Sequence, residues 1–371
     1  MIDIPATYES SRDQFRAALA SLSNRWAGSR LLSHSLADSS DLTIDVISAD
    51  ATHEKQKLLI LTTGLHGIEG YVGAGILQLF IQEYLPRLDP ETTGLVLVHP
   101  INAYGMKHRT RVNNNSVDLN RNFEENFDSL KPLNSHYESL AHLLNPARPL
   151  KNPFYEKLAF AQNVLKALPK GASHIREAAL MGQYRVHNGM YFGGFEPQAE
   201  TKFIQKIVGD AVPDYAQIVL LDIHTGYGPR WQMTLVNPPS EKQTAQETAT
   251  RFNVPLVAGV NPDEFYTIHG DMVEYFYKMV ASKYPEKKVY AGALEFGTYG
   301  DSLLQGIHSL RTTVFENTLR WFGANDAMRE WMKHEYDELF MPADPQWWTK
   351  AQADARQTFD GILRAEGYFK D

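Results

Sequence analysis

Four short apolar runs stand out along the chain, at residues 57–63, 94–98, 218–222 and 289–296, and each stops at a glycine, a proline or a polar residue. Continuous apolar runs without alternation are typical of strands that are buried on both faces, as in a sheet covered by helices. The first run leads through a glycine-rich turn into residues 71–84, whose apolar positions recur at helical spacing. The pattern therefore predicts an α/β fold built from strand and helix units.

Two other regions have a different character. Residues 127–206 are polar, contain scattered prolines, and include helical stretches at 155–167 and 173–181. We interpret this region as a cap or insertion in a single domain spanning residues 1–371. From about residue 312 the composition favours helices, and we expect this extension to dock through four tryptophans, Trp321, Trp331, Trp347 and Trp348.

Composition and charge narrow the classes of protein. The chain has 371 residues, 43% of them hydrophobic, which is enough for a large core. Its 44 acidic and 36 basic residues give a net charge of -8, which argues against a nucleic acid partner. It has no cysteine, so disulfides, thiolate metal ligands and a cysteine nucleophile are excluded. With no signal peptide and no apolar run near the roughly 18 residues of a membrane span, we expect a cytoplasmic protein without a membrane partner. The oligomeric state is not indicated.

The first candidate chemistry follows the first strand. His66 and Glu69 are three residues apart in the turn between that strand and the helix. An imidazole and a carboxylate are normal parts of a catalytic zinc site, and ligands in open α/β sheets bind where strands end. A second pair with the same spacing, His174 and Glu177, lies in the polar insertion, where one exposed helix face explains it. A purely structural role for His66 and Glu69 stays open on these two residues alone.

A third metal ligand is available at the same edge of the sheet. His224 follows the run at 218–222, so it can converge with His66 and Glu69. Two histidines and one carboxylate leave a fourth position for water, which is the catalytic arrangement and not the closed structural one. His99 also ends a strand and is the rival ligand.

Two more motifs carry candidate chemistry. Glu295 interrupts the apolar run at 289–296, where a carboxylate is costly unless it is paired, either with a buried arginine or as a general base beside a metal-bound water. Asn120 and Arg121 end a segment, 107–123, that is rich in basic and amide side chains. An arginine fork beside an amide suits a carboxylate ligand. No G-x-S-x-G motif supports a serine hydrolase.

In this order the motifs resemble those of the zinc carboxypeptidase superfamily, typified by carboxypeptidase A, with the succinylglutamate desuccinylase and aspartoacylase branch as a relative. They are His66-x-x-Glu69, Asp118-x-Asn120-Arg121, Asp222-x-His224 and Glu295, and they lie within residues 57–299, about two-thirds of the chain. The resemblance implies an α/β fold with a central mixed, mostly parallel sheet of about eight strands flanked by helices. It also implies one bound zinc ion.

The resemblance assigns a role to each matching residue. The zinc would be held by His66, Glu69 and His224, and Glu295 would be the general base. Asn120 and Arg121 would bind the terminal carboxylate of the substrate, and Asp118 would accept a hydrogen bond from His66.

Two of the family's positions match less closely. The arginine that polarises the scissile carbonyl lies upstream of Asn120, where Arg111 and Arg109 are both available and Arg111 is preferred. The family's mobile tyrosine would correspond to Tyr266, although the residues around Tyr266 depart from the family pattern and Phe265 occupies the neighbouring position.

The expected function is a zinc-dependent hydrolase that cleaves a peptide or amide bond next to a free carboxylate, in a small molecule or short peptide. An N-acyl amino acid deacylase has the same parts, and a non-catalytic protein that binds carboxylate ligands on this fold is a further alternative. Residues 182–195 are rich in glycine and aromatic residues. They are interpreted either as a loop that narrows the pocket toward a small substrate or as a structural hairpin.

Overall fold

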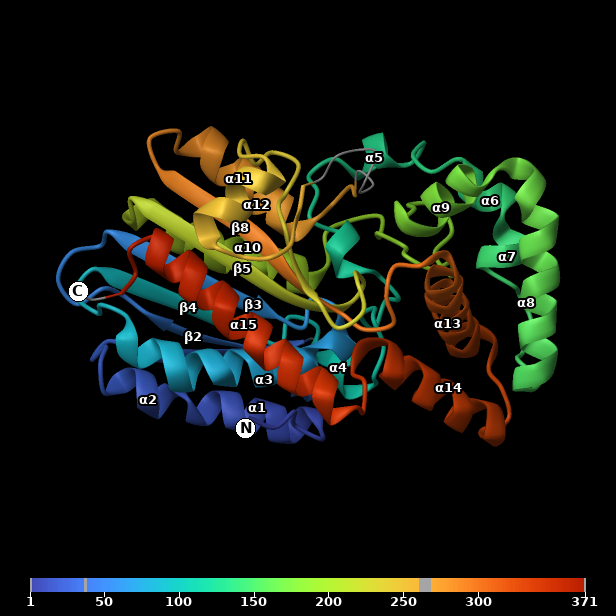
Figure 1. Ribbon diagram of the computed structural model, residues 1–371, viewed down its shortest axis with the longest axis horizontal. Helices are drawn as coiled ribbons and strands as arrows, with labels where there is room; N and C mark the ends of the chain where they lie inside the picture. Colours follow the sequence, from blue (N-terminus) through green and yellow to red (C-terminus); the bar gives the residue numbers. More distant parts are fainter. Residues whose placement is uncertain (1, 37–38, 260–267, 370–371) are drawn as a thin grey trace.

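A computed structural model describes residues 2–36, 39–259 and 268–369 of the chain (Figure 1). Its centre is an eight-stranded mixed sheet with the order β1-β2-β4-β3-β5-β8-β6-β7. The inner strands β4, β3, β5 and β8 are parallel, and β1, β2 and β6 join by antiparallel pairing. This confirms the predicted fold class.

The four predicted strands form the parallel centre of the sheet, and each lies within one residue of its predicted start. The strands are β1 (Arg30–Leu36), β2 (Ser39–Ala49), β3 (Lys57–Thr63), β4 (Thr93–His99), β5 (Gln217–Gly226), β6 (Met233–Val236), β7 (Val257–Ala258) and β8 (Lys288–Gly297). The outer strands were not predicted because they lack continuous apolar runs; β1, for example, alternates between exposed and half-buried positions.

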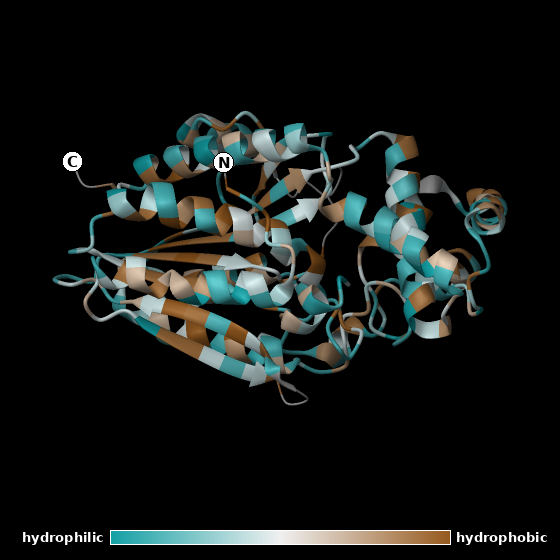
Figure 2. Ribbon diagram, turned by 90° about the horizontal axis from the view of Figure 1, so that it is seen from below, coloured by the Kyte–Doolittle hydropathy of each residue, from teal (hydrophilic) through white to brown (hydrophobic). Residues whose placement is uncertain are grey.

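Helices cover both faces of the sheet. One face packs against α1 (Tyr8–Ala17), α2 (Leu19–Ser23), α3 (Gly70–Leu79), α11 (Ala245–Phe252) and α15 (Pro345–Ala365). The other face packs against α10 (Ala199–Ala211) and α12 (Met272–Lys283). Figure 2 shows the central strands as largely hydrophobic ribbons between these helices. The predicted helix at 71–84 corresponds to α3 and a π-helical turn, Phe80–Tyr84, that continues it.

A helical lobe lies beside this layered body, on the right of Figure 1. We define the helical lobe as α6 (His136–Ser139), α7 (Ala141–Leu144), α8 (Pro153–Ala167), α9 (Ala172–Leu180), α13 (Leu303–Phe322) and α14 (Asp326–Phe340). Its core combines side chains of the insertion, such as Phe160 and Tyr191, with Phe315 and Met332 of the later helices. The helix α5 (Phe127–Leu130) packs separately, near Tyr184. The insertion and the C-terminal helices thus form one packed unit.

The helical lobe meets the sheet at the carboxyl ends of β5 and β8. The Thr225 hydroxyl donates to the Phe340 carbonyl, and the Thr298 hydroxyl donates to the Leu339 carbonyl at 2.6 Å. Both carbonyls belong to the last turn of α14. The lobe is therefore fastened at the edge where open α/β sheets bind ligands.

The four tryptophans divide between the two parts. Trp347 and Trp348 of α15 are buried against the sheet, and the Trp347 indole donates to the Gly297 carbonyl at 3.0 Å. Trp331 packs on the core of the helical lobe. Trp321 does not reach the sheet; it is 36% exposed and its ring meets His187 of the insertion edge to face. In the part of the chain that the structure describes, no helix has the length and apolarity that crossing a bilayer requires.

The turn after β3 depends on two glycines. Gly64 has a φ of 67°, in the left-handed region that favours glycine. At Gly67 a Cβ atom would lie only 2.0 Å from the backbone carbon of Gly105, in α4 (Ala103–Lys107). The turn also receives two backbone hydrogen bonds, because the Gly67 and Ile68 amides donate to the carbonyls of Arg111 and Thr110 at 3.1 and 3.0 Å. Close backbone contact therefore positions His66 and Glu69.

Replacing Gly67 by alanine is expected to lower the free energy of unfolding by about 1–3 kcal/mol or more, because a backbone atom cannot move aside as a flexible side chain can. Gly306→Ala is the matched control, since Gly306 is exposed on helix α13 and a Cβ atom there would have no other atom within 4 Å. That change should be neutral or stabilise by up to about 1 kcal/mol. Urea denaturation measures the free energy of unfolding of both variants. Equal values would contradict the close contact between Gly67 and Gly105.

Candidate metal centre

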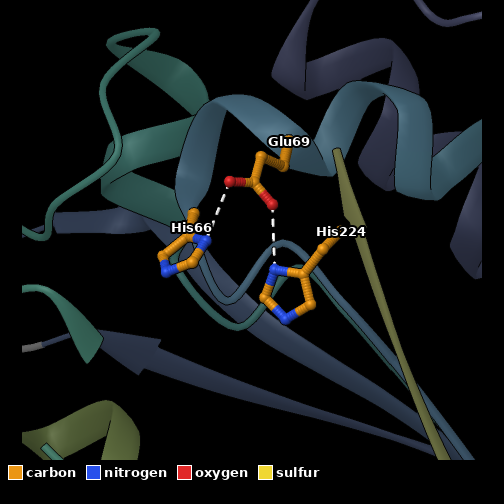
Figure 3. A group of neighbouring side chains, drawn as sticks. All are labelled: His66, Glu69 and His224. Atoms are coloured by element: carbon orange, nitrogen blue, oxygen red, sulfur yellow. Dashed lines mark hydrogen bonds and ion pairs between the residues drawn. The ribbon is translucent and has the colours of Figure 1, made fainter. Parts of the chain in front are cut away.

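His66, Glu69 and His224 come together at the carboxyl ends of β3 and β5 (Figure 3). The Nδ1 atom of His66 lies 2.8 Å from one oxygen of Glu69, and Nδ1 of His224 lies 2.9 Å from the other. One possible ligand atom from each residue falls within 4.8 Å of the others, and all three residues are buried. Residues 155 positions apart thus present two nitrogens and a carboxylate to one point, as an ion would require.

Each histidine has an aspartate at its other nitrogen. The Nε2 atom of His224 lies 2.6 Å from Asp222, whose second oxygen accepts a hydrogen bond from Thr62 at 2.7 Å. The Nε2 atom of His66 lies 3.2 Å from Asp118, close enough for an ion pair but without hydrogen-bond geometry. Carboxylates in this position fix the ring orientation of metal-binding histidines. The imidazoles are therefore held with Nδ1 directed at the shared point.

The charges of this group are strongly coupled. Burial would raise the pKa of Glu69, but the imidazoles of His66 and His224 outweigh it and hold that pKa far below its usual range. Burial likewise disfavours protonated His224, yet the carboxylates of Asp222 and Glu69 hold its pKa well above the usual value. These two carboxylates thus favour the protonated form of His224. A metal that takes the place of this proton releases it.

Glu295 lies beside the group because of the strand register. In the parallel pairing of β5 with β8, Glu295 is directly opposite His224. One of its oxygens accepts a hydrogen bond from the Tyr227 amide at 3.0 Å. Burial, and then the negative charge of Glu69, raise the pKa of Glu295 to about 8. A bound cation would act in the opposite direction and favour the carboxylate.

The two candidate arginines, Arg111 and Arg109, have different partners in the structure. The Nη1 atom of Arg111 lies 3.4 Å from Glu69, and its Nε atom donates to Asp118 at 2.9 Å. The guanidinium of Arg109 is instead paired with Asp337 at 2.9 Å and lies over the ring of Tyr71. The charge of Arg109 thus joins the turn to helix α14. Arg111 is the arginine that reaches the group.

Arg121 is buried, and among the described residues it has no acidic group in direct contact. It is 4% exposed, and its two terminal nitrogens donate to the carbonyls of Asn120 and Leu180 at 2.9 Å each. Among the described residues its Nε atom has no hydrogen-bond partner, and its charge favours the carboxylate forms of Asp118 and Asp271 without a direct ion pair. A buried guanidinium in this state is an unusual cost in free energy, which an anionic ligand would offset.

Asn120 is largely occupied within the chain. Its amide nitrogen donates to Asp271 at 3.0 Å, and its amide oxygen accepts a hydrogen bond from the Met272 amide, also at 3.0 Å. Both partners are at the start of α12, so Asn120 ties the short helix Leu119–Arg121 to that element. One N–H of the Asn120 amide is left for a ligand.

Two other candidate residues, His99 and His174, do not belong to this group. Both ring nitrogens of His99 contact hydroxyl groups, of Thr63 and Ser11, at 2.6 Å, and burial lowers its pKa to about 3. His99 is therefore a neutral core residue and not a ligand of this group. His174 is exposed and contacts the Lys170 carbonyl. Tyr266 lies outside the described residues.

Asp222 is a site residue to which the sequence motifs assigned no role. A signal for it was present, because Asp222 is two residues before His224 on a strand and therefore on the same face. Three tyrosines near Arg111, namely Tyr191, Tyr227 and Tyr336, were also missed. They come from the insertion, from the residue after β5 and from α14, so no local pattern connects them.

The geometry defines an α/β protein with a buried His–Glu–His group that could hold a divalent metal. Two imidazoles and one carboxylate form a donor set that suits zinc and leaves a position open, and the aspartates behind the histidines fit the same use. Among the described residues, this is the group of histidine and acidic side chains whose ligand atoms come close enough together to hold a metal ion.

Comparison with known proteins assigns the family. Residues 5–354 match the family described as "Protein of unknown function (DUF2817)", so the chain belongs to that family. No curated protein matches the chain.

Several solved structures are similar to the chain. Bovine thrombin-activatable fibrinolysis inhibitor, solved with tick carboxypeptidase inhibitor, is 13% identical over 84% of this chain and 97% of its own, with a TM-score of 0.47. Carboxypeptidase A from Helicoverpa armigera is 13% identical over 96% of this chain and 74% of its own (TM-score 0.46). Succinylglutamate desuccinylase from Chromobacterium violaceum is 12% identical over 81% and 73% (TM-score 0.37). Carboxypeptidase and desuccinylase structures are both among those that are similar to the chain.

The site predicts that His224→Ala removes most of the bound metal, since it deletes one of three candidate ligands. After reconstitution with zinc and dialysis, elemental analysis should find about one zinc per chain in the original protein and a small fraction of that in the variant. The control is His174→Ala, which removes an exposed histidine of the other H-x-x-E pair. Equal metal content in both variants would show that the metal is bound elsewhere.

Proposed function

We propose that this protein is a zinc-dependent hydrolase that cleaves a peptide or amide bond next to a free carboxylate. The observation that carries the proposal is the buried guanidinium of Arg121, which has no ion pair among the described residues and acts on the same Asp118 carboxylate as His66. One ring, that of Tyr191, lies within 5.7 Å of Arg121 and within 5.0 Å of Arg111, and Arg111 in turn contacts Glu69. A carboxylate bound at Arg121 is then near the metal ligands.

Arg121 would bind the carboxylate of the substrate. The two terminal nitrogens of a guanidinium form a fork that matches the two oxygens of a carboxylate. In the ligand-free chain these nitrogens are held by backbone carbonyls and not by an acid, so a substrate need not displace an ion pair. The remaining N–H of Asn120 is available to the same carboxylate.

The other residues have separate tasks. When bound, zinc lowers the pKa of a coordinated water and polarises a carbonyl group. Glu295 would accept the proton of the attacking water through its side-chain carboxylate and deliver it to the leaving nitrogen. Arg111 would stabilise the negative charge that develops on the carbonyl oxygen. Asp118 and Asp222 would keep the two imidazoles oriented.

An N-acyl amino acid deacylase would use the same residues in the same way, because its scissile amide also lies next to a free carboxylate. A non-catalytic binding protein would need neither the metal ligands nor a base. In this chain the candidate ligand His224 and the candidate base Glu295 are adjacent, since they lie opposite each other across two strands. The arrangement therefore favours an enzyme.

Glu295→Gln is expected to lower kcat by about 10²–10⁴-fold, because the amide cannot accept a proton. Metal content should be unchanged, since Glu295 is not one of the three ligands. Glu286→Gln is the matched control, because Glu286 is exposed in the turn before the same strand. Rates are measured with panels of N-acyl amino acids and short peptides, and full activity of the Glu295→Gln variant would overturn the assignment of the base.

The free carboxylate requirement has its own test. Substrates that carry a C-terminal amide should be turned over at least 10-fold less efficiently than the matching acids, because Arg121 loses its charged partner. The comparison is of kcat/KM for each pair. Equal values would reject a carboxylate-directed hydrolase, while turnover of peptides but not of N-acyl amino acids would reject the deacylase version.

A further inference from the structure

Arg121 is enclosed by the end of α9 and the loop that follows it. Its Nη2 atom donates to the Leu180 carbonyl at 2.9 Å, and its own carbonyl accepts a hydrogen bond from the Tyr184 hydroxyl at 2.7 Å. At Gly182, where φ is 85°, a Cβ atom would lie only 2.6 Å from Cδ of Arg121. This part of the insertion therefore builds the surroundings of one arginine, and it needs a glycine at the closest point.

The same loop places the ring of Tyr191 against both arginines of the candidate site. The guanidinium carbons of Arg111 and Arg121 lie over this ring, at 5.0 and 5.7 Å from its centre. At such distances the negative face of an aromatic ring attracts a cation, and the attraction is stronger where water is excluded. All three side chains are buried. Tyr191 therefore stabilises two buried positive charges at once.

The ring stabilises Arg121 without competing with a carboxylate ligand. An acidic side chain in its place would form hydrogen bonds with the same N–H groups that a substrate carboxylate needs. An aromatic ring attracts the cation and leaves those N–H groups available. Among the described residues, two N–H donors of Arg121 are used, by the carbonyls of Asn120 and Leu180, while its Nε–H has no partner. The guanidinium is thus kept both charged and able to bind an anion.

Tyr191 is itself held in place by its loop, by Tyr227 and by the helical lobe. Its carbonyl accepts a hydrogen bond from the Gln183 amide at 3.1 Å, and its hydroxyl lies 2.5 Å from the hydroxyl of Tyr227. Its φ of 53° lies in the left-handed region, which bulky residues adopt only where the surrounding structure holds them. Its side chain belongs to the core of the helical lobe, so the ring cannot leave the arginines without disrupting that packing.

We propose that Tyr191 is a positioning residue of the candidate site, whose ring face holds the guanidinium groups of Arg121 and Arg111 where they bind the substrate. The inference rests on the proposed function, because it takes Arg121 as the carboxylate-binding group and Arg111 as the group that stabilises the carbonyl oxygen. Tyr191 acts through these two arginines. The insertion is then a part of the site, because it supplies the aromatic ring and the loop that enclose Arg121.

The test weakens the ring face while keeping the shape of the ring. Trifluorophenylalanine at position 191 has fluorine atoms that withdraw electron density from the ring and so reduce its attraction for a cation. Tyr191→Phe is the reference, because it keeps the ring face and loses the hydroxyl. The readout is the ratio of kcat/KM for a free acid to kcat/KM for the matching C-terminal amide. Tyr191→Phe should keep this ratio within about 2-fold of the original, and the fluorinated protein should lower it by about 3-fold or more.

Tyr191→Leu removes the ring and should lower the same ratio by about 10-fold, because the KM of the acids rises while the KM of the amides does not. It should lower kcat for both substrates, since Arg111 loses its contact as well. A purely structural role would reduce the amount of active protein and leave the ratio of acid to amide unchanged. Tyr155→Leu is the matched control, because the Tyr155 ring lies 5.3 Å from the guanidinium carbon of Arg148 on the surface of the same insertion; it should not change the ratio.

The possible results separate the inference from the proposed function. Equal ratios in the fluorinated and Tyr191→Phe proteins would overturn the inference and leave the proposed function intact. This comparison decides even if Tyr191→Leu fails to fold, because both proteins keep the shape of the ring. An unchanged ratio in a folded Tyr191→Leu protein would overturn the inference too. A ratio near one in the original protein, or no turnover of any acid, would reject the inference and the proposed function together.

Discussion

The carboxylate of Glu69 is a negative charge in the interior of the protein, and such a charge is stable only when it is paired and hydrogen-bonded. Its two oxygens are shared among the imidazoles of His66 and His224, the guanidinium of Arg111 and the backbone amide of Thr225. These partners come from the turn after β3, from β5 and from the segment before Asp118. The positions of the two imidazoles and of the Arg111 guanidinium therefore depend on this carboxylate.

The fold brings these partners together through one geometric rule. Parallel strands end at the same edge of a sheet, so the residues that follow β3 and β5 meet although they are far apart in sequence. The register between β5 and β8 then adds Glu295 beside His224. The helical lobe is fastened to this same edge, and it is the part that brings Tyr191 over the arginines. The strand ends therefore position the His66, Glu69 and His224 group, and the helical lobe packs against the same edge of the sheet.

Much of this arrangement could be predicted from the sequence, because it depends on local patterns. Continuous apolar runs identified the four central strands, and the polar residues that follow them identified His66, Glu69 and His224 as neighbours. Glu295 stood out as a single carboxylate in an apolar run. In each case burial on both faces leaves a clear signal in a few consecutive residues, and the common edge of parallel strands supplies the rest.

Only the tertiary structure decided which of two equivalent side chains faces the site. Arg109 and Arg111 are two residues apart, and the difference arises because Asp337, far along the chain, pairs with Arg109. His99 also ends a central strand, yet Ser11 of helix α1 and a neighbouring threonine occupy its ring nitrogens. Sequence by itself determined the four central strands and the residues at their ends, since these follow from short-range hydrophobic pattern. The partners of each polar group, and the cover that Tyr191 provides, depend on contacts between distant segments, which no local pattern records.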